Sequence, residues 1–143
     1  MKYFLKLNVV SMLYALMVFV PLELMVNVYR ITRLLNWKVD TVNIMTGIML
    51  IVEIIGGTLL ILFLTRKWLD GRKASFWTII LWLPYFILFI YIFASIFPIT
   101  NGGDYPNPAT GLLAIGGLIV YPFYILILNF VGMISDDETN RTI

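Results

Sequence analysis

Residues 41–65 read TVNIMTGIMLIVEIIGGTLLILFLT, an apolar run with a single charged side chain, Glu53, near its centre. About 20 apolar residues make a helix long enough to cross the ~30 Å hydrocarbon core of a bilayer. Fourteen residues between 42 and 64 are Ile, Leu, Val or Phe, which favours insertion by about 6 kcal/mol. One central carboxylate costs on the order of 3 kcal/mol. The segment is therefore predicted to cross a membrane with Glu53 inside it.

Three more apolar runs of similar length surround this segment. Backbone groups in lipid must pair internally, so each run is predicted to be a helix. The gaps between the runs are short, which favours antiparallel neighbours. The sequence thus predicts an all-α integral membrane protein, a four-transmembrane-helix antiparallel bundle forming one transmembrane domain over residues 1–143. The predicted spans are approximately 7–29, 41–65, 74–97 and 110–134.

The composition excludes several classes of function. Of the 143 residues, 61% are hydrophobic and 13% charged, whereas a soluble domain has about 45–50% apolar and about 25% charged residues. The lipid bilayer is therefore the expected surroundings. The net charge of +2 is not clustered, so no nucleic-acid partner is expected. The chain has no Cys and no His, which removes thiol nucleophiles, Cys/His metal sites and the commonest general base. We expect no enzyme, no cofactor and no metal.

The distribution of basic residues predicts the orientation. The start of the chain suggests a signal peptide, but its apolar run is too long and no small-residue cleavage site follows, so a retained anchor is expected. Four spans place both termini on one side. That side carries seven basic residues: Lys2, Lys6, Arg66, Lys67, Arg72, Lys73 and Arg141. The other side carries three: Arg30, Arg33 and Lys38. The positive-inside rule places both termini in the cytoplasm of a multi-pass cell-membrane protein. Dual topology and a first helix that does not span remain alternatives.

Glu53 is the centre of one candidate site for a ligand or a proton. Thr46 lies about 20° from Glu53 around the helix at 100° per residue, and Asn43 borders the same face. When the midpoints of the four spans are placed at the centre of one bilayer, Tyr85 and Tyr121 lie at the same depth as Glu53. No Lys or Arg lies at this depth, so hydroxyl groups are the expected partners and Glu53 is expected to be neutral. An intramembrane acid is a default candidate for a proton or cation site. The alternative is a structural acid that ties helices together.

A second, weaker candidate is a polar stripe beyond Pro21. Glu23, Asn27 and Arg30 recur at helical spacing. They are predicted either to line an outward-facing polar vestibule or to form a stripe at the membrane interface. Asp104, in the loop of residues 98–109, suggests no role by itself.

The string Glu53-Ile54-Ile55-Gly56-Gly57, followed by Thr65-Arg66, resembles the second helix of DoxX-like four-helix membrane proteins. The resemblance covers about fifteen residues. The first apolar segment lacks the Arg and Gly features of that group. A single buried acid in a four-span chain is also similar to the small multidrug resistance transporters, although there the acid belongs to the first helix. We assign no family from either resemblance.

Two functions remain in view from the sequence. The first is a small accessory, scaffold or immunity-type protein that acts by helix–helix interaction, as a homodimer or on a larger membrane partner. The second is a small transporter or ion-coupled carrier built around Glu53. A DoxX-like membrane protein is a further alternative, implied by the resemblance alone. An intramembrane enzyme would need an acid/base or metal set that the composition does not offer.

Overall fold

The computed structural model describes residues 2–69 and 73–141, with the backbone alone for residues 135–141. Over these residues the chain is helical and contains no strand, as predicted. Its α-helices are α1 (Lys2–Val26), α2 (Val28–Leu35), α3 (Val39–Leu69), α4 (Thr78–Ile96) and α5 (Pro108–Arg141). Two short 3₁₀ helices, η1 (Lys73–Trp77) and η2 (Gly102–Asp104), lie before α4 and before α5.

Four of these helices are long and apolar enough to cross a membrane: Lys2–Val26, Val39–Leu69, Lys73–Ile96 and Pro108–Ile134. Each corresponds to one of the four runs in the sequence, with shifted ends. α3 extends beyond 41–65 at both ends, and the first four residues of the third run, 74–97, belong to η1 rather than to an α-helix. Residues 70–72 of the basic turn lie outside the described residues.

The first predicted span, 7–29, is divided at Asn27. α1 continues through Pro21 and ends at Val26, so the helix does not end at the proline. Asn27 has φ −97° and ψ 13°, outside the usual helical range. Its side chain donates to the Glu23 carbonyl at 2.9 Å and to the Glu23 carboxylate at 2.8 Å. This side-chain competition for backbone partners accompanies the break, and α2 follows as a separate short helix.

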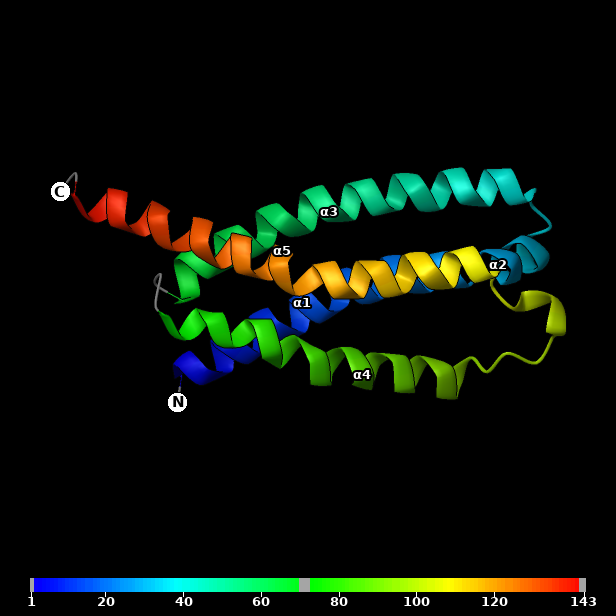
Figure 1. Cartoon of the computed structure of the whole chain (residues 1–143), viewed down its shortest axis with the longest axis horizontal. Coiled ribbons are helices and arrows are strands. Elements are labelled where there is room, and N and C mark those ends of the chain that lie inside the picture. Colours follow the sequence, from blue (N-terminus) through cyan, green and yellow to red (C-terminus); the bar gives the residue numbers. More distant parts are fainter. Residues whose placement is uncertain (1, 70–72, 142–143) are drawn as a thin grey trace.

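α1 is the central helix of the molecule. It packs most extensively against α4 and α3 and also contacts α5, and α3 and α4 lie on opposite sides of it (Figure 1). In the most apolar part of α1 28% of the residues are buried, against 6% in α3 and 11% in α5. Both chain ends lie at one end of the molecule, and α2 lies at the other (Figure 1).

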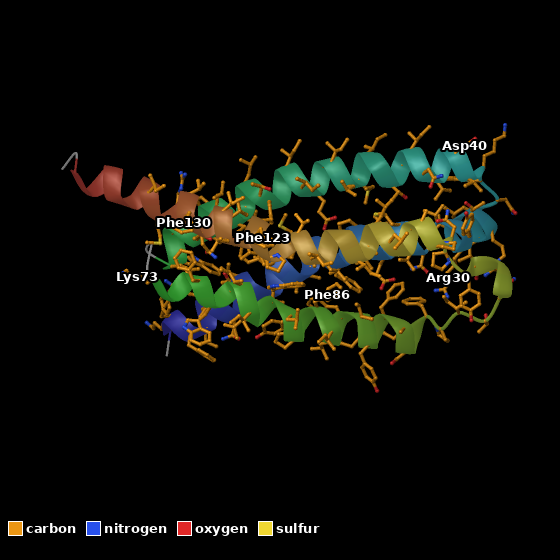
Figure 2. All side chains as sticks on the ribbon, viewed as in Figure 1. Arg30, Asp40, Lys73, Phe86, Phe123 and Phe130 are labelled. Atoms are coloured by element: carbon orange, nitrogen blue, oxygen red, sulfur yellow. The ribbon has the colours of Figure 1, made fainter. Side chains whose placement is uncertain are left out.

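The core occupies the half of the molecule nearest the chain ends. It is built from the first half of α1, the last part of α3, the start of α4 and the middle of α5. Its members include Val10, Tyr14, Ile61, Leu69, Trp82, Phe86, Ile125 and Leu128. Phe86 points into this core, whereas Phe123 and Phe130 of α5 are exposed (Figure 2). Toward α2 the helices leave clefts on both sides of α1. Most of the candidate site residues line cavities there, but Glu53 and Tyr85 do not.

Candidate functional site

Glu53 borders the contact between α3 and α1. Thr46, 20° away on the helix, is buried, and a Cβ built on Gly57 would lie 2.6 Å from Met17 Cε of α1. Thr58, which faces α5 and shares a 2.5 Å hydrogen bond with the Tyr124 hydroxyl, lies about 140° away from Glu53. Glu53 therefore lies toward the α1 side of α3, where it is partly exposed.

The structure gives Glu53 no hydrogen bond and no ion pair with any residue that it describes. Its neighbours on the exposed side of α3 are apolar, such as Met49, Val52 and Leu60. An acid at the middle of an apolar helix thus has neither a protein partner nor an aqueous pocket.

The two tyrosines predicted at the depth of Glu53 have other partners. The Tyr85 hydroxyl donates to Asn8 Oδ1 at 2.6 Å. α1 lies between α4, the helix that carries Tyr85, and α3 (Figure 1). The Tyr121 hydroxyl donates to the Tyr14 carbonyl at 2.5 Å. Equal depth in the membrane does not fix the direction around the helix axis, so neither hydroxyl makes a hydrogen bond with Glu53. Tyr121 nevertheless lies close enough to Glu53 for an electrostatic interaction between the two side chains.

Asn43 and Thr46 lie about three and about two turns of α3 away from Glu53. Both line a cavity of about 320 Å³ near the α2 end of the molecule, together with Tyr29, Asn107 and residues of α5. Neither side chain makes a hydrogen bond within the described residues. The structure therefore separates the predicted set into Glu53 and a polar pair closer to the end of the helix.

The same cavity continues inward between α1, α3 and α5. A second cavity, of about 270 Å³, shares Met25, Leu50 and Leu113 with the first. It ends at Tyr121 and Tyr124. We call the two together the α1–α3–α5 cleft.

Glu23, Asn27 and Arg30 lie together in the structure. They line a cavity of about 370 Å³ between α1, α2 and the end of α4, and its remaining walls are apolar. Arg30 donates to the carbonyls of Phe97 and Pro98 at 3.0 Å each. The arginine thus anchors the loop after α4 and does not point a free charge into the cavity.

Asp104 is a residue that the sequence reasoning missed. It is 2% exposed and accepts from Arg33 Nε at 2.9 Å and from Arg33 Nη2 at 2.7 Å. Arg30 Nε lies 3.7 Å from the same carboxylate. The hydrogen bonds and charge of Arg33, with the charge of Arg30, hold the pKa of Asp104 below its ordinary value of 3.8. The loop before α5 is thereby fastened to α2. The pairing of one acid with two arginines at the same end was the available signal.

A buried polar group in the core was also missed. The Asn129 amide of α5 donates to the Thr78 hydroxyl at 2.9 Å, and that hydroxyl donates to the Ser75 carbonyl at 2.7 Å. All three residues are fully buried. This connection between α5 and the start of α4 stabilises the closed half of the molecule.

No protein-family model, curated protein or solved structure matches the chain. The short resemblance to DoxX-like proteins is therefore without a supporting family match. Function must be argued from the site itself. Among the described residues no group of three His, Cys, Asp or Glu side chains is placed to hold a metal ion.

Proposed function

We propose that the chain is a multi-pass protein of the cell membrane, an antiparallel bundle of four spans with both termini in the cytoplasm. The exposed surface of the long helices supports this proposal, since it carries large apolar side chains along α3, α4 and α5. Such a surface is far larger than soluble monomers expose. In a bilayer the lipid tails would contact this apolar surface, so no further protein would be needed to bury it.

The positions of the charges support this orientation. Lys73 lies at the end of the molecule that holds the termini, whereas Arg30 and Asp40 lie at the other (Figure 2). Arg30 and Arg33, two of the three basic residues that oppose the positive-inside assignment, are engaged by Asp104 and by loop carbonyls. Their charge is thus partly compensated at the outer end.

Within the membrane, the protein is proposed to act by helix–helix interaction, as an accessory, scaffold or immunity-type protein. The single observation that supports this function is Glu53, partly exposed and without a partner on an otherwise apolar helix face. An intramembrane acid usually faces protein or water and pairs there. A second membrane helix with a hydrogen-bond donor or a cation near its middle would supply this partner.

The chemistry of Glu53 favours a larger partner over a second copy. A two-fold contact through this residue would bring two carboxyl groups together, which requires that at least one of them stays protonated. A different helix that offers Lys, Arg or an amide has no such requirement. Polar contacts of this kind contribute about 0.6–2 kcal/mol between membrane helices. Packing would drive the association, and the polar contact would determine which residues of the two helices align.

The test compares Glu53→Gln with Glu53→Leu after chemical cross-linking in the native membrane. Glutamine keeps hydrogen-bonding capacity, so the cross-linked partner is expected to remain with Glu53→Gln and to be lost with Glu53→Leu. Val52→Leu, on the lipid-facing side, is the matched control and should leave the partner in place. Retention of the same partner by Glu53→Leu would contradict the proposal.

A second candidate is a small ion-coupled carrier. The observation that favours it is the α1–α3–α5 cleft, which is open toward the α2 end while the other half of the molecule is packed. This carrier would use Glu53, which does not itself line the cleft but lies on α3 beside the lining residue Ile54, as its proton site. Proton-coupled uptake in liposomes that is lost in Glu53→Gln, with the fold intact, would select the carrier over the helix-contact function.

A further inference from the structure

The α1–α3–α5 cleft has a polar outer part and an apolar inner part. Around the outer part, side chains of Asn43, Thr46, Asn107 and Thr110 supply amide and hydroxyl groups. The inner part is lined mainly by aliphatic and methionine side chains, and only the tyrosines at its end carry polar atoms. No charged side chain of the described residues lines either part. The cleft therefore matches an amphiphile with an uncharged head.

Two polar side chains in the outer part are unused. Thr46 is 8% exposed and makes no hydrogen bond within the described residues, and the Asn43 amide makes none either. Asn107 differs, because its side chain accepts from the Thr110 backbone at 2.8 Å and donates to Tyr29. Both side chains face the cavity, so their polar groups are accessible to a ligand there. Thr46 and Asn43 thus form a site with free hydrogen-bonding capacity at the entrance of an apolar channel.

The length of the cleft fits one lipid chain. From Asn43 to Ile54 α3 rises about 16 Å at 1.5 Å per residue, and one leaflet contributes about 15 Å of the hydrocarbon core. The polar end lies toward the α2 end of the molecule. A lipid of the leaflet on that side would enter the cleft with its head at the level of Asn43.

We propose that the α1–α3–α5 cleft binds one acyl chain of an uncharged glycerolipid of the diacylglycerol type, with its hydroxyl and ester oxygens at Thr46 and Asn43. Lipid tails are as apolar as the cleft walls, so the chain itself gives little preference and the head decides the selectivity. A charged phosphate would lie among groups without a compensating cation. The inference depends on the proposed membrane placement but not on the partner of Glu53.

The test is photo-cross-linking in phosphatidylcholine liposomes, with a diacylglycerol that carries a diazirine on its acyl chain. The probe is expected to label α1 and α5 along the cleft, and excess unlabelled diacylglycerol should compete. A phosphatidylglycerol with the same chain should label at least fivefold less. Loss of one hydrogen bond of about 1 kcal/mol weakens binding about fivefold, so Thr46→Val should lose about fivefold in labelling. Thr41→Val, outside the cleft, should lose none.

A steric variant tests the inner part. A Cβ on Gly117 meets nothing within 4 Å, and Gly117 lines the inner cavity, so Gly117→Leu should fill the cleft without a clash and reduce labelling about tenfold. Gly116→Leu is the matched control, since Gly116 is equally open and lies outside the lining. Wild-type labelling of Gly117→Leu, or equal labelling by both probes without competition, would overturn the inference. If Gly117→Leu does not fold, Thr46→Val alone decides. Loss of the Glu53 partner has no effect on these results, so the two proposals fail separately.

Discussion

Thr78→Val removes the acceptor of a buried amide and should destabilise the protein by about 2 kcal/mol. In the wild type the Asn129 Nδ2 group donates to Thr78 Oγ1 at 2.9 Å in a fully buried position. Valine has nearly the same shape as threonine, so the change leaves the amide donor without its partner. An orphaned buried polar group costs about 1–3 kcal/mol.

Asn129→Leu should cost less, about 1 kcal/mol. It removes the amide itself, and the Thr78 hydroxyl keeps its bond to the Ser75 carbonyl at 2.7 Å. No donor is then orphaned, and the remaining cost is the lost hydrogen bond and the change of shape. The two substitutions together should cost about 2 kcal/mol rather than 3. The difference between the sum of the single effects and the effect of the double substitution, about 1 kcal/mol, is the coupling energy of the pair. It lies between the mean of about 0.6 and the maximum of about 1.7 kcal/mol measured for hydrogen bonds between membrane helices.

The assay is reversible unfolding by sodium dodecyl sulfate in mixed micelles, followed by the fluorescence of the four tryptophans. Ser95→Ala is the control, because its hydroxyl bonds only to the Tyr91 carbonyl of its own helix in an exposed position. It should change the free energy of unfolding by less than about 0.5 kcal/mol. A Thr78→Val effect within that range, or strict additivity of the two core substitutions, would refute the claim that this bond connects α4 to α5.

Three further perturbations test other parts of the molecule. Asp104→Asn should release the loop after α4. The release would be measured as faster thiol labelling of Thr100→Cys, in a chain that otherwise has no cysteine. Because the pKa of Asp104 is lowered, the wild-type loop should stay bound to α2 at pH 7 and pH 5 and loosen only below pH 3.8. Gly57→Val should destabilise the α1–α3 contact by about 1–3 kcal/mol, whereas Gly56→Val, whose Cβ meets open space, should have little effect; equal effects would contradict the described helix face. Trp82→Ala should lower the free energy of unfolding by about 3 kcal/mol. This is the low end for a buried tryptophan, because the side chain would otherwise contact lipid rather than water. A smaller destabilisation would mean that the core does not centre on this side chain, which is 2% exposed.

Depth along the helices predicted that Tyr85 and Tyr121 lie beside Glu53. In the structure both hydroxyls have other hydrogen-bond partners. Depth is a local property, because 1.5 Å per residue converts a residue number into a height. The direction of a side chain toward a neighbour depends on which helix packs where. α1 occupies the centre, and Tyr85 consequently meets Asn8.

Polar pairs within one stretch of helix were easier to predict than pairs across the chain. Glu23, Asn27 and Arg30 line one cavity although the helix breaks at Asn27. Their spacing of three and four residues is that of one helix face. Arg33 and Asp104 are 71 residues apart, and no periodicity connects them. The packing of η2 on α2 brings this pair together.

The sequence by itself determined that the chain is helical and that four of its helices are long and apolar enough for a bilayer. Composition and run length decide these properties locally, because every backbone group of an apolar segment in lipid must pair within its own helix. Only the tertiary structure decided that α1 is central, that the half nearest the termini is packed while the other half holds clefts, and that Glu53 has no partner among the described residues. These depend on the directions in which side chains meet, which follow from the packing of whole helices against one another.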